Sequence, residues 1–437
     1  MLHCIGIRKE TKDHTERRVP LVPEQVARLH RDHGLRILVE PMANRIFSDE
    51  EFRAAGAELT EDLSDANIII GVKEIHPRYM LDDKAYLFFS HTIKAQSYNM
   101  GMLRHMLEHH LTLLDYELIR DERNRRLVFF GNFAGLAGMI DTLWALGKRL
   151  DAQGIASPFS RILYASEYGL LEHAEQGIRE VGEAIRCDGL PSALVPFVTG
   201  FTGYGNVSKG AQSLYELLPV EHIAAGDLEA FMRGGRFSDR VVYSVEFREE
   251  DLVARIDDSS AFDLQEYYTH PERYRGVFDA YLPHLSVLIN GIYWDEHFPR
   301  LLSLEAARAL WAQGTPRLRA IGDISCDIDG SVQLTVKGTT SDNPVYVHDP
   351  LTGVVTDGWE GERGPVILAV DKLPTELPRE ASIAFGMSLE PFIPALARAD
   401  FSHSFDDMAL PPELRRAVIA HKGVLTPDHA HLEGHLP

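Results

Sequence analysis

The first third of the chain alternates short apolar runs with amphipathic runs. The apolar runs predict β-strands at Cys4–Ile7, Arg36–Glu40, Ala66–Val72, Ala85–Ser90 and Leu111–Asp115. The runs between them, in which apolar residues recur every three or four positions, predict helices at Pro23–His33, Asp49–Ala55 and Gln96–His109. Such alternation predicts a parallel sheet covered by helices on both faces.

A second pattern of the same kind follows a long apolar segment, about Ala134–Asp151, which predicts a helix that connects two domains. The later strands are predicted at Leu194–Thr199, Val241–Phe247, Val287–Ile292 and Ala320–Ile324. Residues 221–240 lengthen the chain segment between the first two of these strands, so we expect them to form an insertion. A helical tail is predicted over about Glu380–Arg398.

Between strand and helix in the second pattern, residues 193–212 read ALVPFVTGFTGYGNVSKGAQ. Glycines at such a turn let the backbone approach a pyrophosphate, and the helix N-terminus offers unpaired N–H groups. Gly203 and Gly205 fill the first two places of G-x-G-x-x-G, whereas Ser208 stands at the third. The turn therefore fits a dinucleotide, and equally an ordinary glycine turn between strand and helix.

Composition narrows the class of partner. The 437 residues carry a formal net charge of −21, with 65 acidic against 44 basic side chains, which argues against nucleic acid or an anionic membrane as a partner. The three cysteines fit a reducing compartment, and neither a membrane span nor a targeting peptide is visible.

His105, Glu108 and His109 spell H-x-x-E-H, but no third ligand is evident, so we expect no metal.

Polar residues cluster where the predicted strands end, which is where open α/β sheets bind their ligands. A lysine, a histidine and arginines in such places suit proton transfer and a carboxylate-bearing substrate. The candidates are Arg18, Lys73, His91, Glu117, Arg126, Asp323 and Asp327.

A set of motifs runs in one order from about Ile5 to Leu425, and in this the chain resembles the lysine–2-oxoglutarate reductases. These form saccharopine and make up one half of the bifunctional aminoadipate-semialdehyde synthases. The motifs are IGIRKETK, ERRVPL, VKEI, YLFFSHTIKAQ, GNFAGLAGMIDTL, TGYGNVSKGAQ, YYTHPERY, LINGIYWDEHFPRLL, GDISCDIDGS and AVDKLPTELPREAS. Ser208 at the third glycine place is itself a trait of that family. A more distant similarity runs to monofunctional saccharopine dehydrogenase and to alanine dehydrogenase with the transhydrogenase domain.

The resemblance implies an α/β protein of two Rossmann-like domains, with parallel sheets flanking a central cleft. Residues 1–133, completed by the C-terminal segment 365–437, would form a substrate domain like that of alanine dehydrogenase. Residues 134–364 would form the dinucleotide-binding domain, with its connector helix and insertion.

The implied reaction joins the ε-amine of L-lysine to the keto carbon of 2-oxoglutarate and reduces the imine, the first step of lysine degradation. By resemblance, Lys73 and His91 transfer protons, either residue taking either role. Arg18 and Arg126 would bind substrate carboxylates, and Glu117 with Asp323 or Asp327 would hold ammonium groups.

The cofactor contacts are expected from Gly203, Gly205, Asn206, Val207, Ser208 and Arg248. Arg248 favours a cofactor with a 2′-phosphate, which is NADPH. Acidic residues follow it in the sequence, so NADH remains the alternative cofactor. Two alternatives remain: a related amino-acid dehydrogenase or imine reductase with another amine or 2-oxo acid, and a non-catalytic nucleotide-binding subunit.

The remaining expectations concern the setting of the enzyme. The absent transit peptide suggests a cytoplasmic protein, and the chain stops where the bifunctional enzyme continues, so a separate saccharopine dehydrogenase would take the product. Homo-oligomer formation is compatible with the sequence.

Overall fold

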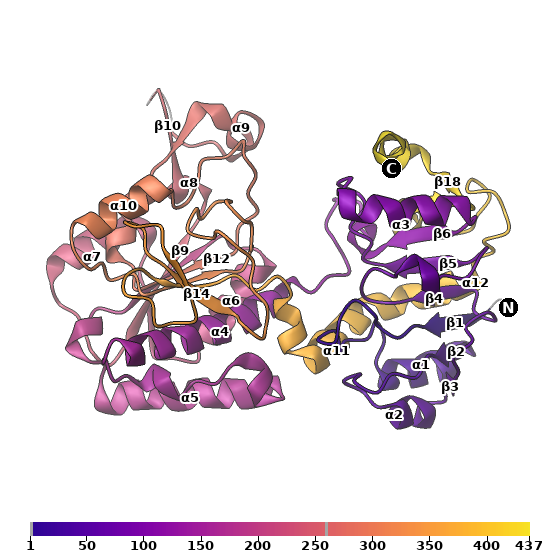
Figure 1. Cartoon of the computed structure of the whole chain (residues 1–437), viewed down its shortest axis with the longest axis horizontal. Coiled ribbons are helices and arrows are strands. Elements are labelled where there is room, and N and C mark those ends of the chain that lie inside the picture. Colours follow the sequence, from indigo (N-terminus) through magenta and orange to yellow (C-terminus); the bar gives the residue numbers. More distant parts are fainter. Residues whose placement is uncertain (1–2, 258–260) are drawn as a thin grey trace. The chain divides into compact units, whose positions relative to one another are not determined.

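The computed structural model describes residues 3–257 and 261–437. The chain forms two compact units, one of Met1–Phe130 with Pro378–Pro437 and one of Gly131–Leu377 (Figure 1). Residues 131–133 and 365–377, assigned from the sequence to the first domain, lie in the second unit. The second of these segments carries a strand of the second sheet, which explains the difference.

The first unit is built on an eight-stranded sheet with the order β18-β17-β6-β5-β4-β1-β2-β3. Its six N-terminal strands are all parallel, while β17 runs antiparallel to β6 and adds the C-terminal segment to the sheet. The strands are β1 Cys4–Ile7, β2 Arg36–Val39, β3 Glu58–Leu59, β4 Ile68–Ile70, β5 Ala85–Phe88, β6 Thr112–Asp115, β17 Val418–His421 and β18 Val424–Leu425.

Helices cover both faces of this sheet, and each face has its own apolar core. Local signals fix the helix ends: Ser48 and Glu51 form a capping box at the start of α2, and Gly34 ends α1 in the left-handed conformation, with φ of 63°. The helices are α1 Pro23–His33, α2 Asp49–Ala54, α3 Ser97–Glu108, α11 Pro378–Leu389, α12 Ile393–Arg398 and α13 Pro412–Arg416.

The second unit holds another eight-stranded sheet, with the order β15-β14-β16-β13-β12-β7-β9-β8. It is parallel from β16 to β8, with β14 and β15 antiparallel at one edge. The predicted insertion contains β8, which lies outside β9 as an extra edge strand. The strands are β7 Val198–Thr202, β8 Val220–His222, β9 Val242–Phe247, β12 Val287–Asn290, β13 Ala320–Asp323, β14 Val345–His348, β15 Val355–Asp357 and β16 Val366–Leu368.

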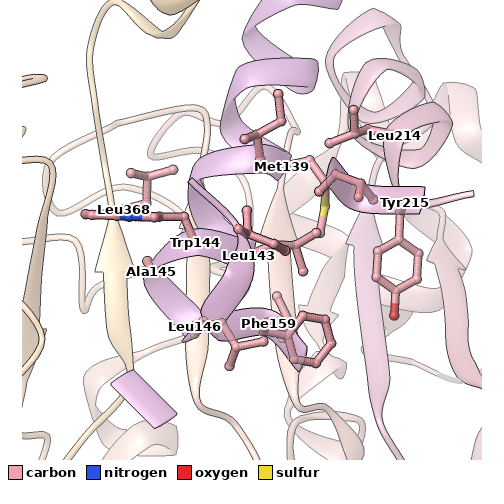
Figure 2. Packing of buried hydrophobic residues seen from close by; sticks show 14 of the residues in the cluster. Met139, Leu143, Trp144, Ala145, Leu146, Phe159, Leu214, Tyr215 and Leu368 are labelled. Atoms are coloured by element: carbon pink, nitrogen blue, oxygen red, sulfur yellow. The ribbon is translucent and has the colours of Figure 1, made fainter. Parts of the chain in front are cut away.

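The connecting helix of the prediction, α4 at Gly131–Ala152, is instead a core element of the second unit. It packs with α5 and α6 on one face of the sheet, around buried side chains that include Met139, Leu143 and Trp144 (Figure 2). The remaining elements are helices α5 Leu171–Asp188, α6 Asn206–Tyr215, α7 Leu228–Gly234, α8 Glu249–Leu252, α9 Leu264–Thr269 and α10 Leu304–Ala312, with a hairpin of β10 Val253–Arg255 and β11 Tyr274–Gly276.

Two glycines allow α4 and α6 to cross at very short distance. A Cβ on Gly135 would overlap the carbonyl oxygen of Val207, and one on Gly210 would overlap that of Asn132. The crossing holds the N-terminal end of α6, which follows the glycine turn, against the most buried helix of the unit. The third glycine of a dinucleotide fingerprint serves close helix packing, and here Gly210 provides that close approach.

Within the described residues, no helix is long and apolar enough to cross a membrane.

Candidate active site

Lys73 and His91 both lie just beyond the carboxyl ends of neighbouring parallel strands in the first unit. Lys73 follows β4, and His91 follows β5, which pairs with β4. The sequence predicted this placement, and the sheet brings the two positions to the same edge. His91 has a φ of 50°, an uncommon conformation for a residue with a side chain. Backbone strain of this kind is concentrated at functional sites.

The ring of His91 is oriented by Glu74. The Nδ1 atom of His91 lies 2.8 Å from Oε1 of Glu74, whose side chain is only 8% exposed. A carboxylate can only accept a hydrogen bond, so Nδ1 carries the proton and Nε2 is left for proton exchange. Burial raises the pKa of Glu74, but the hydrogen bond and charge of His91, together with the charge of Lys12, lower it to about 2. Glu74 is therefore a carboxylate at neutral pH.

Asp115 ties the His91 turn to the neighbouring turn. Its Oδ2 accepts the backbone N–H of Ser90 at 2.8 Å, and its Oδ1 accepts that of Glu117 at 2.7 Å. Burial raises the pKa of this fully enclosed carboxyl to about 6. A single buried side chain thus fixes the backbone beside both His91 and Glu117.

Arg18 is 2% exposed and forms a two-pronged ion pair with Glu16. Its Nε and Nη2 atoms lie 2.8 and 2.6 Å from the two oxygens of Glu16, and its guanidinium lies 4.2 Å from the centre of the Phe130 ring. Two of the three guanidinium nitrogens of Arg18 are thus already hydrogen-bonded to Glu16. A substrate carboxylate at Arg18 would have to use Nη1 or displace Glu16.

Two further candidates contact each other. Nη2 of Arg126 lies 3.1 Å from Oε2 of Glu117, with Arg126 42% and Glu117 15% exposed. The sequence assigned them to opposite charges of the substrate. In the structure they form an ion pair that a zwitterionic ligand could open by supplying both partners.

The glycine turn of the second unit joins β7 to α6. Gly203 has a φ of 80°, which disfavours any other residue, whereas Gly205 has an ordinary φ of −76°. Among the described residues, and apart from its own chain neighbours and the backbone of the following helix, no atom lies within 4 Å of a Cβ built on Gly205. The protein itself therefore does not require glycine at 205, but a ligand phosphate that approaches the first turn of α6 does. The residues present fit a dinucleotide pyrophosphate.

A cavity of about 430 Å³ opens beside this turn, at the carboxyl ends of β7, β9 and β12. Its far side is lined by residues from the segments 249–253, 267–268 and 293–301. Its wall is strongly aromatic, with contributions from Tyr204, Tyr267, Tyr268, Tyr293, Trp294 and Phe298. Such a cavity suits a flat ring system.

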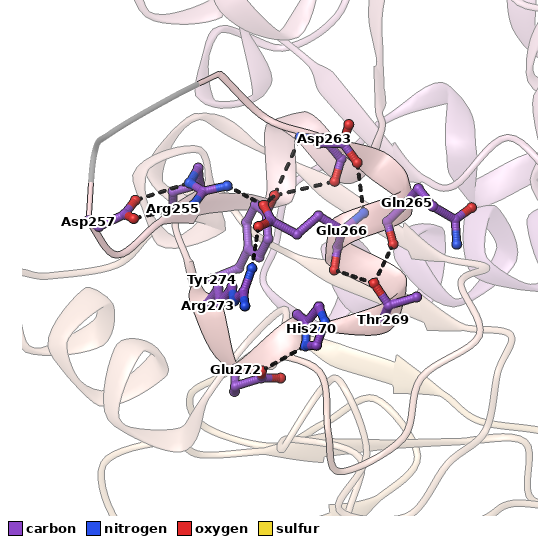
Figure 3. A network of polar contacts seen from close by, with 10 residues as sticks. All are labelled: Arg255, Asp257, Asp263, Gln265, Glu266, Thr269, His270, Glu272, Arg273 and Tyr274. Atoms are coloured by element: carbon purple, nitrogen blue, oxygen red, sulfur yellow. Dashed lines mark hydrogen bonds and ion pairs between the residues drawn. The ribbon is translucent and has the colours of Figure 1, made fainter.

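Glu266 stabilises the segment that forms this aromatic wall (Figure 3). Its Oε1 accepts from Arg273 at 2.7 Å, while its Oε2 accepts from Tyr274 at 2.7 Å and pairs with Arg255. One carboxylate therefore links both strands of the β10–β11 hairpin to α9.

Arg248 stands where β9 ends, beside the cavity. Its guanidinium lies 5.1 Å from the centre of the Tyr204 ring in the glycine turn, and Nη2 lies 3.0 Å from Oε1 of Glu246. Glu246 in turn accepts a hydrogen bond from Gln212 of α6 at 3.0 Å. An acid, the residue type that binds the ribose of NAD, and an arginine, the type that binds the 2′-phosphate of NADP, are thus both present at this strand end.

Asp323 and Asp327 differ sharply in their surroundings. Asp323 is 1% exposed and accepts hydrogen bonds from Asn290, Ser325 and Thr335. Burial raises its pKa, which those bonds oppose. Asp327, four residues further on in the loop after β13, is exposed. Asp323 is thus engaged in holding the loop after β13, and Asp327 is the accessible acid.

Sequence reasoning missed Glu16 and Glu74, the partners of Arg18 and His91. Glu16 stands two residues before Arg18, which is a local signal that could have found it. Glu74 follows Lys73 but lies 17 residues from its partner His91, so no local signal pairs these two. It also missed the aromatic wall, although YYTHPERY and IYWDEHF are unusually rich in rings.

Of the two histidines in the H-x-x-E-H motif, His105 lies on α3 and His109 follows its last residue. Their rings are 4.0 Å apart between centres, and His109 pairs with Asp82 at 2.8 Å. In the part of the chain that the structure describes, no three His, Cys, Asp or Glu side chains group closely enough to hold a metal ion.

Fold and site together define a class: two Rossmann-like units in the arrangement of elements found in alanine dehydrogenase. Residues 6–137 match the family described as "Alanine dehydrogenase/PNT, N-terminal domain". A solved L-alanine dehydrogenase superposes with a TM-score of 0.58, covering 99% of this chain and 100% of that one at 18% identity. A transhydrogenase from Sinorhizobium meliloti gives a TM-score of 0.51, covering 97% and 99% at 14% identity. The predicted fold class, two Rossmann-like domains with mostly parallel sheets, is confirmed.

Three curated relatives match nearly the whole chain. Alpha-aminoadipic semialdehyde synthase of Arabidopsis thaliana is 40% identical over 97% of this chain, and the mitochondrial protein of Rattus norvegicus is 36% identical over 98%. The chain spans 40% and 47% of their lengths. "Saccharopine dehydrogenase [NAD(+), L-lysine-forming]" of Neurospora crassa is 29% identical over 89% of both chains. These proteins are homologues of this chain, and the resemblance inferred from the motifs is confirmed.

Proposed function

We propose that this chain is a saccharopine-forming lysine–2-oxoglutarate reductase. The observation that carries the proposal is the similarity to alpha-aminoadipic semialdehyde synthases along nearly the whole chain, at 36–40% identity. The His91–Glu74 pair beside Lys73 supports it, because this geometry suits the proton transfers that an amine–carbonyl condensation needs.

The proposed chemistry begins with the ε-amine of lysine, which has a pKa near 10.4 in water and must lose a proton before it attacks. Lys73 or His91 accepts that proton, and the other donates one as the carbinolamine loses water. His91 is suited to both directions, since Glu74 fixes its tautomer and leaves Nε2 for exchange. A bound nicotinamide supplies the hydride that reduces the imine.

For the substrate charges, we propose that Arg18 and Arg126 receive carboxylates and that Glu117 and Asp327 receive ammonium groups. The Arg126–Glu117 pair supports this, because it already presents both charges at one place. Asp323, which the sequence offered as an alternative to Asp327, is proposed only to hold the loop after β13, since its oxygens accept three hydrogen bonds from the chain.

We propose that residues 131–377 bind the dinucleotide, and that residues 1–130 with 378–437 bind the substrates. The pyrophosphate would lie at Gly203, Gly205, Asn206, Val207 and Ser208, and the adenine in the aromatic cavity. We propose NADPH as the preferred cofactor, because Arg248 can present a guanidinium that is already oriented by Tyr204.

Replacing Arg248 tests this preference. Arg248→Ala should weaken NADPH binding roughly 10- to 100-fold, since a phosphate loses a charged partner, and should change NADH binding by less than about threefold. Fluorescence titration with both cofactors measures this, and Arg233→Ala on α7, where Arg233 is exposed, is the matched control. Equal losses for both cofactors would contradict the assignment of the 2′-phosphate to Arg248.

The function itself is tested by following NADPH absorbance with 2-oxoglutarate and a panel of amines. Lysine should be turned over well and ornithine poorly, and pyruvate should not replace 2-oxoglutarate. Absence of turnover with lysine across pH and cofactor would leave the related imine reductases or a non-catalytic role.

A second candidate is the reverse reaction, NAD-dependent formation of lysine from saccharopine. The similarity to the Neurospora crassa enzyme over 89% of both chains favours it. Saccharopine with NAD⁺ or NADP⁺, in the same assay, separates the two directions by their relative kcat/KM.

The cellular location, the oligomeric state and the enzyme that takes the product are also proposals. A reducing, cytoplasmic location is supported by Cys4, Cys187 and Cys326, all of which are free thiols. We propose a homo-oligomer, and a separate saccharopine dehydrogenase as the enzyme that consumes the product.

A further inference from the structure

Glu10 is a partly buried acid that lies directly behind the strand end carrying Lys73. Its Oε1 accepts the backbone N–H of Val72 at 2.6 Å, and its Oε2 accepts that of Lys73 at 3.0 Å. Both oxygens are thus used on two successive backbone groups. The backbone at 71–72 is further held by β5, through Gly71 N–H to Leu87 and Phe89 N–H to the carbonyl of Val72.

This arrangement replaces a missing strand partner. β4 ends at Ile70, so the N–H groups of Val72 and Lys73 need acceptors from outside the sheet ladder. A carboxylate that bridges two N–H groups fixes the backbone direction more tightly than one oxygen can. The direction in which Lys73 leaves the backbone therefore depends on Glu10.

Charged groups surround Glu10 on several elements. Glu16 raises the pKa of the Glu10 carboxyl and Arg8 lowers it, while Arg45, Tyr116 and Lys73 stand within electrostatic reach of Glu10 or Glu16. Burial and the charge of Glu16 raise the pKa of Glu10 to about 7, against the opposing hydrogen bonds from Val72 and Lys73. Glu16 is itself the partner of Arg18.

We propose that Glu10 is a positioning residue for Lys73, which holds the end of β4 in its active geometry through two backbone hydrogen bonds. The inference rests on the proposed function, since it assumes that Lys73 takes part in proton transfer. The ionised carboxyl accepts both N–H groups more strongly than the protonated form, whose hydroxyl oxygen is a weak acceptor, so the active geometry is populated as Glu10 loses its proton.

The test compares Glu10→Gln with Glu61→Gln in the full-length protein. Gln keeps the size of Glu, but its amide nitrogen faces a backbone N–H and cannot accept. In E10Q, kcat/KM for lysine at pH 8 should fall about tenfold, mainly through kcat, while the Kd of NADPH stays within twofold. In E61Q both should stay unchanged, because Glu61 is 69% exposed and pairs only with Lys9 near the surface.

The pH dependence separates positioning from mere stabilisation. The wild-type kcat/KM should rise through an ionisation near pH 7 that is missing in E10Q. Glu10→Asp keeps an ionisable group that is one methylene too short. It should retain a pH-dependent step at lower activity, and it serves as the second variant if E10Q fails to fold.

A readout without activity keeps this inference distinct from the proposed function. In protein labelled with ¹³C at the glutamate carboxyl carbon, one resonance should titrate near pH 7 in the wild type and in E61Q, and be absent in E10Q. If that resonance is present but lysine is not a substrate, the proposed function fails and the placement of Glu10 stands. An E10Q enzyme with wild-type kcat/KM and pH profile would overturn the inference.

Discussion

Glu74 and His91 show how one contact decides which atom of a side chain can react. The 2.8 Å contact to Glu74 commits Nδ1 of His91, so Nε2 is the atom that the proposed mechanism uses for proton exchange. His91→Gln removes the titrating group but keeps a polar side chain of similar reach. We expect kcat to fall about 10²- to 10⁴-fold, with the Kd of NADPH unchanged, in steady-state assays paired with fluorescence titration.

The chain offers a matched control for this pair. His109 and Asp82 make the same kind of contact, also at 2.8 Å, but both are exposed on the surface around α3. His109→Gln should leave kcat unchanged. Comparable losses in the two variants would mean that His91 has no special role.

Glu74 also links stability to pH. Its pKa lies near 2 in the folded chain and near 4.5 in an ordinary environment, so the ionised form favours folding. The stabilisation is present above about pH 4.5 and is lost as the pH falls toward 2. Glu74→Gln should therefore lower the free energy of unfolding at pH 7 by at most about 3 kcal/mol.

Thermal unfolding between pH 3 and 7 measures this effect. The difference in Tm between wild type and E74Q should stay constant from pH 7 to about pH 5 and shrink as the pH falls from about 4.5 to 3. A difference that stays constant over this range would show that the Glu74 carboxylate gains nothing from His91 and Lys12.

Single site residues were predictable from the sequence where their position at the end of a predicted strand was enough to make them candidates. Lys73 and His91 stand at strand ends, and an apolar run followed by a base is visible in the sequence. Their partners were not predictable, because Glu10, Glu16 and Glu74 sit among many acids and only the fold selects which of these meets which base. The burial of Asp323 was hidden for the same reason, since Asn290 and Thr335 come from distant segments.

Among the elements, the crossing of α4 and α6 is the least tolerant contact. Gly135→Ala adds one carbon where the carbonyl of Val207 already lies, so the helices must separate. We expect a loss of about 3 kcal/mol in the free energy of unfolding, together with weaker NADPH binding, because α6 carries the phosphate turn.

Gly101→Ala is the matched control, since Gly101 lies in the middle of α3 with open space around it. Its replacement should be neutral or stabilise by up to about 1 kcal/mol, through helix propensity alone. Urea unfolding compares the two variants, and equal effects would contradict the close crossing.

Helices and strands were predicted best where the hydrophobic periodicity agrees with residues that begin or end an element, such as proline and glycine. β1 and α1 have the predicted bounds, because a buried strand and a proline-started, glycine-ended helix leave little freedom. β7 begins four residues later than predicted, after Pro196, since a proline cannot donate to the sheet ladder. The predicted tail helix is divided into α11 and α12 near Pro391.

For the whole chain, the discontinuity of the first unit has a testable consequence. Residues 131–377 hold a complete sheet with helices on both faces, whereas residues 1–130 lack α11, α12 and β17, which cover and extend their sheet. A fragment of residues 131–377 should fold and bind NADPH within about tenfold of the full chain.

A fragment of residues 1–130 provides the comparison, and should show little cooperative unfolding because it exposes the apolar face that α11 and α12 cover. Circular dichroism with thermal unfolding distinguishes the two fragments. A cooperative 1–130 fragment, or an unfolded 131–377 fragment, would contradict this division of the chain.

The overall architecture could be predicted from the alternation of strands and helices, which leaves few topologies for a parallel sheet. The exact boundary between the two units could not be predicted from the sequence. β16 at Val366–Leu368 is a short apolar strand that fits either sheet by its pattern, and its pairing with β13 and β14 assigns it to the second unit.

The proposed reaction joins the ε-nitrogen of lysine to 2-oxoglutarate by reduction. To test it, the enzyme is incubated with ε-¹⁵N-lysine, 2-oxoglutarate and NADPH, and the product is identified by mass spectrometry and NMR. We expect saccharopine, with the label in the secondary amine and one NADPH consumed per product. Unchanged lysine, or a product in which the α-nitrogen has reacted, would contradict it.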